Sequence, residues 1–157
     1  MSFLHFIKKI GESLKDIFLL TVRLAWGTWF LLAGLGKWNS LDKVVDYFRE
    51  LGIPYPEFNV YAAMFTEIIG GALLILGLFS RVAAIPLIVV MLVALATAHH
   101  EAIANLFNQP QEILNQAPFT FLMAAMIVFI FGPGRISLDY LMGRGCKDKH
   151  GDRCDYE

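Results

Sequence analysis

Charged residues and cysteines are both scarce in this chain. Aspartate, glutamate, lysine and arginine make up 17% of its 157 residues, against 57% hydrophobic residues. The formal net charge is −1, which gives no basic surface for binding nucleic acid. Only two cysteines occur, Cys146 and Cys154, both among the last twelve residues. The apolar part of the chain therefore has no thiol with which to carry out chemistry.

The hydrophobic content is too high for a soluble domain of this size. A chain of 17.6 kDa forms one domain by length, and its interior would be too small to hide so much apolar side chain. Thirteen Phe and three Trp suit lipid contact and anchoring at the membrane interface. The composition predicts an integral membrane protein whose partner is the lipid bilayer.

Four apolar runs predict helices that span the membrane. They cover residues 17–36, 59–79, 82–98 and 117–132. At about 1.5 Å per residue, the first two cover a hydrocarbon core of about 30 Å and the last two cover it narrowly. Lipid offers backbone groups no hydrogen-bond partner, so such runs must be helical. The first run follows Lys8 and Lys9 as a signal peptide would. Its length, the charge of Arg23 and the lack of a small-residue cleavage site predict that it is retained.

The predicted fold class is all-α, an integral membrane four-helix bundle over residues 1–142 with a charged cytoplasmic tail over 143–157. Two amphipathic helices are expected in the membrane interface beside the spans. One covers residues 3–16, and the other runs from Leu41 to Leu51, where apolar residues repeat at helical spacing.

The distribution of basic residues predicts that both termini are cytoplasmic. With four spans, residues 1–16, the turn at Arg81 and the C-terminal segment share one side, which holds nine lysines and arginines. The opposite side holds three in its first loop and none in residues 99–116. The positive-inside rule assigns the richer side to the cytoplasm.

Membrane oxidases that form disulfides need cysteines on the outer side of the membrane. Both cysteines of this chain are predicted on the cytoplasmic side, so disulfide-forming chemistry is excluded.

Ionisable residues inside the first two runs are the best candidates for function. Arg23 lies on one stripe of its helix with Gly27 and Gly34, and Glu67 shares a face with Gly70. Small residues let helices approach closely and keep a charge away from lipid, so both stripes should face inward. From the rise per residue, the two charges differ in height by under about 10 Å, a gap that an arginine can largely close.

These residues predict a polar cluster in the outer half of the bundle. Lys37 ends the first span, and His99 and His100 end the third, in the same leaflet as Glu67. Two simpler interpretations stay open: Arg23 and Glu67 pair only to fix helix register, or Lys37 extends to lipid headgroups. No metal is expected here, because adjacent helical histidines point roughly 100° apart and cannot easily grip one ion.

Cofactor motifs are few. Cys146, His150 and Cys154 align at helical spacing in the tail, a weak zinc pattern whose role stays open. A transmembrane haem would need opposed histidines on two spans, and only His99 and His100 lie near one. No glycine-rich nucleotide motif follows a strand, so a flavin or nicotinamide site is not indicated.

Several short motifs, in this order and spacing on four helices, resemble the DoxX family of small bacterial membrane proteins, which includes the DoxD-like subunit of thiosulfate:quinone oxidoreductase. The resemblance covers about Val22 to Leu141. Its motifs are Arg23 with residues 34–37, Glu67 within 67–71, residues 77–81, His99, and residues 132–139. Arg81 and Asp139, inside two of these motifs, are expected to be structural.

The resemblance implies a bacterial inner-membrane protein linked to redox metabolism. We therefore expect a site for a quinone or another small molecule in the outer half of the bundle. Glu67 would accept or relay a proton, and His99 or His100 would hydrogen-bond a carbonyl. Arg23 and Lys37 would stabilise the resulting negative charge.

Two further functions stay open. The chain could be a non-enzymatic accessory subunit, whose Arg23–Glu67 pair holds the bundle and whose outer surface docks partner subunits. A small transporter is less favoured, because a single four-helix unit has no duplicated half. The oligomeric state is not fixed by the sequence.

Overall fold

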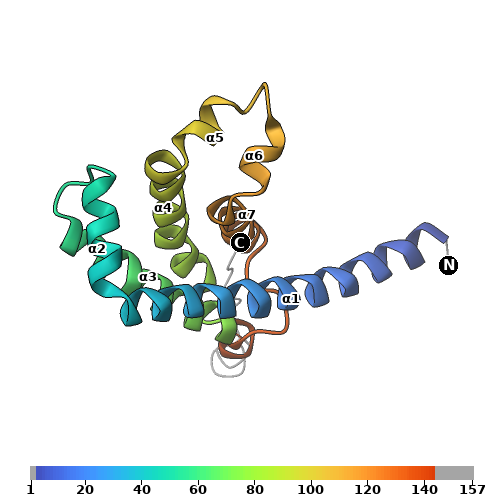
Figure 1. The fold of residues 1–157 in the computed structure, drawn as a ribbon. Helices are drawn as coiled ribbons and strands as arrows, with labels where there is room; N and C mark the ends of the chain where they lie inside the picture. The colour runs from blue at the N-terminus through green and yellow to red at the C-terminus, as the bar shows by residue number, and fades with distance from the viewer. Residues whose placement is uncertain (1–2, 144–157) are drawn as a thin grey trace.

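The computed structural model describes the backbone of residues 3–143 and the side chains of residues 11 and 14–143. Over this range the chain is helical and has no β-strand, so the all-α prediction is confirmed. Figure 1 shows the helices in chain order. They are α1 Phe3–Asn39, α2 Leu41–Glu50, α3 Pro56–Leu76, α4 Ser80–Ala98, α5 His100–Ala104, α6 Pro110–Leu114 and α7 Ala117–Phe131.

The first helix is longer than the sequence pattern suggests. α1 runs unbroken for 37 residues, so the helix predicted over residues 3–16 is present but continues directly into the first span. No proline interrupts this stretch, and Gly11 keeps a helical conformation, so nothing ends the first segment before the second begins. At 1.5 Å per residue α1 is roughly 55 Å long. Its N-terminal part projects well beyond the other helices (Figure 1).

Three helices in the described part of the chain are long and apolar enough to cross a membrane. They are the segment Leu14–Asn39 of α1, all of α3 and all of α4. These correspond to the first three predicted spans. α7 is equally apolar but has fifteen residues, or roughly 22 Å of helix, against a hydrocarbon core of about 30 Å. The protein is an all-α membrane protein with three clear spanning helices and one shorter apolar helix.

The amphipathic helix predicted from Leu41 is present as α2. Its Val45 is buried, and α2 packs against α3 while its charged residues face outward. Gly52, with a φ of +70°, follows the helix in the left-handed conformation that glycine adopts readily. Pro56 then begins α3 at a position where the missing N–H costs nothing.

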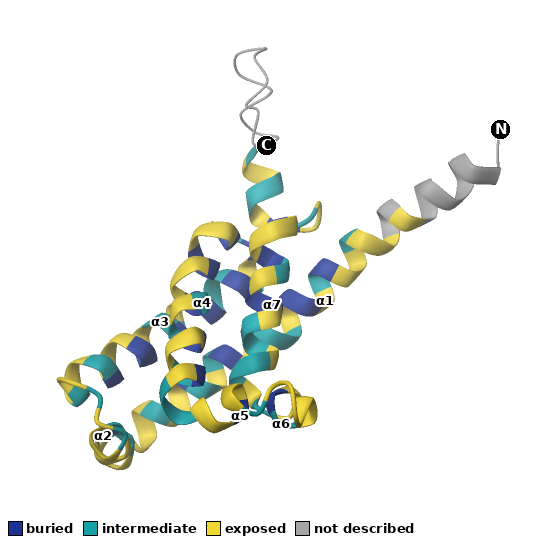
Figure 2. Cartoon of the chain, turned by 90° about the horizontal axis from the view of Figure 1, so that it is seen from above, coloured by how far each residue is buried: buried dark blue, intermediate teal, exposed yellow. Residues whose placement is uncertain are grey.

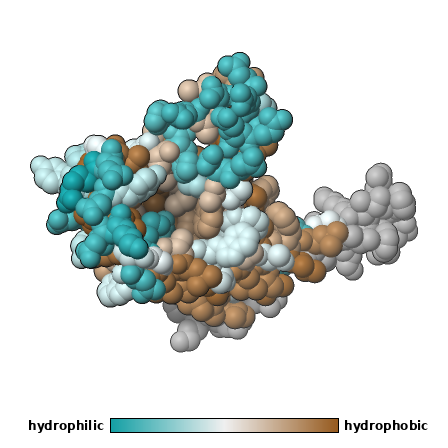
Figure 3. Space-filling model, viewed as in Figure 1, coloured by the Kyte–Doolittle hydropathy of each residue, from teal (hydrophilic) through white to brown (hydrophobic). Residues whose placement is uncertain are grey.

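The helices pack as two main pairs, α1 with α3 and α4 with α7. Buried residues lie on the faces that these helices turn toward one another (Figure 2). The core cluster contains Val22, Phe30, Leu74, Leu87, Met91, Ala124, Ala125 and Val128. The outward faces carry many exposed apolar side chains, and the hydrophilic surface in Figure 3 gathers over α2 and over α5–α6. That distribution suits helices whose sides contact lipid and whose connections reach water.

Candidate functional site

A buried ion pair joins α1 to α3. The Lys37 ammonium Nζ lies 2.5 Å from Oε2 of Glu67 and donates a hydrogen bond to it. The Glu67 side chain is 3% exposed and the Lys37 side chain 24% exposed. The carboxylate is thus enclosed by protein, while the lysine connects it to the surface.

Glycines bring these two helices close together. A Cβ built on Gly71 of α3 would lie 2.7 Å from the Gly27 carbonyl oxygen and from the Leu31 nitrogen, both in α1. Gly34 of α1 approaches the backbone of α3 at Met64 and Ile68 in the same way. The small residues predicted to face inward therefore do line the helix interface, and the Lys37–Glu67 pair lies beside it.

One oxygen of Glu67 remains available. Oε2 takes the Lys37 hydrogen bond, whereas no described residue donates a hydrogen bond to Oε1. A carboxylate has room for several donors. Oε1 therefore keeps the capacity to accept a further O–H or N–H donor.

Arg23 does not join this site, and the predicted Arg23–Glu67 cluster is wrong. Arg23 is 1% exposed, and its guanidinium is surrounded by backbone carbonyls. Its Nε donates to Leu74 O at 3.0 Å, and its Nη1 donates to Ile136 O at 3.0 Å and to Pro133 O. Its Nη2 is also 3.5 Å from Ile75 O. Arg23 holds the end of α3 and the C-terminal loop onto α1.

The error comes from helix register. α1 and α3 are antiparallel, with Gly34 opposite Met64 and Ile68, and Arg23 opposite Leu74. Glu67 is therefore level with about the tenth residue beyond Arg23 on α1. Ten residues of helix are about 15 Å, too far for one side chain to bridge. Lys37 lies only about one helical turn beyond the level of Glu67, so its side chain can extend back along α1 and reach the carboxylate.

The C-terminal loop, residues 132–137, and the helical residues that follow it from Leu138 make contacts that the sequence did not reveal. The Asp139 carboxylate accepts hydrogen bonds from the N–H groups of Phe79 (2.8 Å) and Ser80 (3.2 Å), which caps the start of α4. Asp139 N–H donates to Gly77 O at 3.0 Å. The structural role expected for Asp139 is thus visible as a helix cap.

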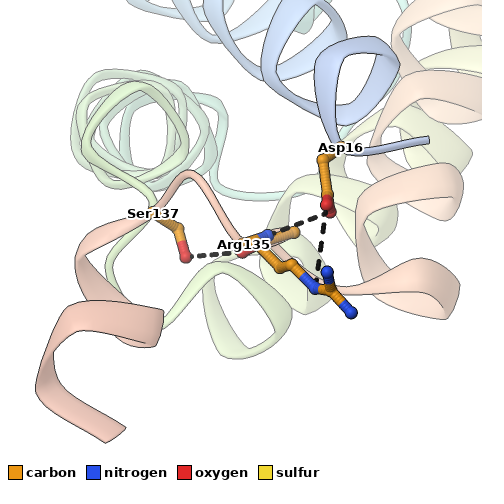
Figure 4. Close-up of polar contacts among 4 residues, drawn as sticks. Asp16, Arg135 and Ser137 are labelled. Carbon is orange, nitrogen blue, oxygen red and sulfur yellow. Dashed lines mark hydrogen bonds and ion pairs between the residues drawn. The ribbon is translucent and has the colours of Figure 1, made fainter. Parts of the chain in front are cut away.

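The same loop is bonded to the N-terminal half of α1, at Asp16. The Arg135 N–H donates to Asp16 Oδ1 at 3.1 Å, and the Arg135 side chain lies 3.8 Å from Asp16 Oδ2 (Figure 4). Ser137 Oγ donates to Gly134 O at 2.8 Å and so closes a turn within the loop. Arg81, the other expected structural residue, is exposed and lies against Gly132.

The histidines lie at the junction of α4 and α5. His99 ends α4 and His100 begins α5, where the His100 ring approaches Thr97 O at 3.4 Å. Neither histidine contacts Glu67 by a hydrogen bond or an ion pair in the described part of the chain. Because α1, α3 and α4 alternate in direction, this junction lies at the same end of the bundle as Lys37.

No group of three or more metal-binding side chains occurs among residues whose side chains are described. Cys146, His150 and Cys154 lie outside the described residues, as does the charged tail predicted over 143–157 apart from its first residue.

The fold and the site together define an all-α membrane protein with a buried ion pair between its first two spanning helices. Residues 18–100, more than half of the chain, match the sequence profile of the DoxX family. The chain belongs to the DoxX family, as its motifs suggested.

Related proteins come from distant bacteria. The Escherichia coli (strain K12) inner membrane protein YphA is 29% identical over 132 residues, covering 80% of this chain and 90% of YphA. The uncharacterized membrane protein Rv3486 of Mycobacterium tuberculosis is 31% identical, covering 76% of this chain and 78% of Rv3486. CatD of Bacillus subtilis, provisionally named an oxidoreductase, is 24% identical over 85% of this chain and 92% of CatD. No solved structure matches the chain significantly.

Proposed function

We propose that this protein is a quinone-linked redox subunit of the bacterial inner membrane, with the Lys37–Glu67 pair as its proton-handling site. One observation carries the proposal: Glu67 is enclosed in a membrane-spanning helix, bonded to Lys37 through Oε2 and open to a further donor at Oε1. Ionisable residues kept inside membrane spans are usually functional. The oxidoreductase name given to CatD supports the redox assignment.

The two side chains would divide the chemistry between them. Glu67 Oε1 would accept the hydroxyl proton of a quinol, and the ammonium of Lys37 would stabilise the charge left on the quinol oxygen. Lys37 is the more exposed partner, so it opens the route by which a proton reaches the surface. His99 or His100, at the same end of the bundle, would complete that route. Arg23 has no part in it, because its donors are taken by carbonyls.

Glu67→Gln is expected to lower the quinone content of the purified protein by about ten- to a hundred-fold. The amide keeps the shape of the carboxylate but loses a hydrogen bond to a charged group, which contributes roughly 1.5–3 kcal/mol. Quinone would be extracted from protein purified in mild detergent and measured by mass spectrometry.

The matched control is Asp46→Asn, because Asp46 forms an exposed ion pair with Arg49 on α2. That variant should retain wild-type quinone. A folded Glu67→Gln protein with as much quinone as the wild type would exclude Glu67 from the site.

The alternative is an accessory subunit in which the pair only fixes the packing of α1 on α3. The position of the pair beside the glycine-lined interface favours this function. In that case the double variant Lys37→Met with Glu67→Leu should stay folded and keep its partner subunits, because apolar residues often replace a buried ion pair without loss of stability. A double variant that folds but loses quinone would favour the redox site.

We also propose four spans, with α7 as the fourth and both termini in the cytoplasm. Nine basic residues would then share the cytoplasmic side. The two cysteines, Cys146 and Cys154, provide the test, because the chain has no others. A membrane-impermeant maleimide should label them only after spheroplasts are permeabilised, whereas a cysteine introduced by Asn108→Cys should react in intact spheroplasts. The reverse pattern would invert the orientation.

A further inference from the structure

An apolar hollow of about 320 Å³ lies between α1 and α7. Both helices contribute apolar side chains, and Leu114 of α6 also lines the hollow. Apart from Leu114, the lining residues are Phe18, Thr21, Val22, Trp26, Phe119, Thr120, Met123, Ala124 and Ile127. The packing of α1 on α7 is much less extensive than that of α1 on α3, which leaves this space open.

A second hollow of about 280 Å³ adjoins the first. It is lined by Leu14, Lys15, Phe18, Leu19 and Phe131, so Phe18 forms a wall of both. Together the two hollows form the α1–α7 groove, which follows α1 from Leu14 to Trp26. Twelve residues of helix rise, or roughly 18 Å, separate its ends.

The groove has a positive charge at one end. The Lys15 ammonium lies 5.6 Å from the centre of the Phe131 ring and forms no ion pair with any described residue. The neighbouring carboxylate, Asp16, accepts a hydrogen bond from Arg135 N–H and pairs with the Arg135 side chain (Figure 4). Lys15 is the second residue of the membrane-compatible segment Leu14–Asn39, which places it where hydrocarbon meets headgroups.

The lining and the length of the groove indicate what fills it. Mostly apolar side chains line both hollows. The run of roughly 18 Å along α1 is comparable to one leaflet of the hydrocarbon core, about 15 Å. A hydrocarbon chain suits such a groove, and the bilayer supplies such chains directly.

We propose that the α1–α7 groove binds an anionic phospholipid, with its phosphate at Lys15 and an acyl chain along Phe18, Val22 and Met123. Basic side chains beside grooves between membrane helices are a recurrent way of binding anionic headgroups. The free ammonium and the length of the apolar groove match the two halves of such a molecule. This site is separate from the Lys37–Glu67 pair and does not depend on the proposed redox function.

The test measures binding of phosphatidylglycerol and phosphatidylcholine to the full-length protein in detergent by native mass spectrometry. The wild type is expected to prefer phosphatidylglycerol. Lys15→Gln should bind phosphatidylglycerol roughly five-fold more weakly and lose the preference. Lys43→Gln, which removes the same charge from exposed α2, should bind as the wild type does.

A second variant tests the apolar part of the groove. Thr120 is exposed and lines the first hollow, so Thr120→Phe should fill the hollow without disturbing the core and weaken binding of both lipids. Wild-type binding by either Lys15→Gln or Thr120→Phe would overturn the proposal. So would an isoprenoid quinone that co-purifies in the groove and is lost in Thr120→Phe but not in Lys15→Gln.

Discussion

Arg23→Met is expected to destabilise the protein by about 3–5 kcal/mol and to remove most of its folded yield. The guanidinium donates hydrogen bonds to carbonyls at the end of α3 and in the C-terminal loop. Methionine fills similar space but donates nothing. The partly buried carbonyls of Pro133 and Ile136 would then lose this donor, whereas Leu74 O would keep its hydrogen bond from Gly77 N–H. A buried acceptor left without a donor costs about 1–3 kcal/mol.

The measurement is the amount of monodisperse protein and its melting temperature in detergent. Arg49→Met is the matched control, because Arg49 is exposed and, among the residues that the structure describes, forms its ion pair with Asp46 on the surface. That variant should change the stability by less than about 1 kcal/mol. Arg23→Lys should fall between the two, because an ammonium keeps the charge but lacks the planar fork of donors that reaches several carbonyls at once. Equal melting temperatures for Arg23→Met and Arg49→Met would show that the carbonyl contacts do not hold the fold.

Gly71→Val is expected to separate α1 from α3 and to break the Lys37–Glu67 pair. A Cβ at this position meets backbone atoms of Gly27 and Leu31 at 2.7 Å, and backbone cannot move aside as a flexible side chain can. Overpacking of a close-packed interior typically costs about 1–3 kcal/mol. The loss of stability caused by Gly71→Val should lie at or above the upper end of this range, because two whole helices must shift.

Gly36→Val gives the matched comparison. Gly36 lies in α1, and an added Cβ there meets nothing within 4 Å. Both variants replace a helical glycine by the same residue, so helix propensity cancels in the comparison. Melting temperature in detergent should fall by many degrees for Gly71→Val and change little for Gly36→Val. A similar fall in melting temperature for both variants would mean that the helix propensity of valine, and not the contact between α1 and α3, causes the loss of stability.

The local features of this fold could be predicted from sequence, because they depend on short-range periodicity. Apolar runs located α3 and α4 to within a few residues, and the repeat beginning at Leu41 located α2. The glycine stripes correctly predicted which faces of α1 and α3 meet. Each of these predictions rests on residues less than about twenty positions apart.

The partners of the buried charges could not be predicted in the same way. Whether Glu67 meets Arg23 or Lys37 depends on the register between two antiparallel helices, and the connection through α2 sets that register. The hydrogen-bond acceptors around Arg23 are backbone carbonyls. Every residue type has a backbone carbonyl, so the sequence does not indicate which residues provide them. The sequence left open that Lys37 extends to lipid headgroups. In the structure Lys37 instead forms an ion pair with Glu67.

The contacts of Arg23 also have a consequence for the order in which the protein is made. Its acceptors at Pro133 and Ile136 lie 110 and 113 residues further along the chain. At about 5–20 residues per second, they leave the ribosome roughly 5–20 s after Arg23. The other acceptors named for Arg23, at Leu74 and Ile75, are translated earlier. The nascent protein therefore completes the contacts of Arg23 only after residues 133–136 have been translated.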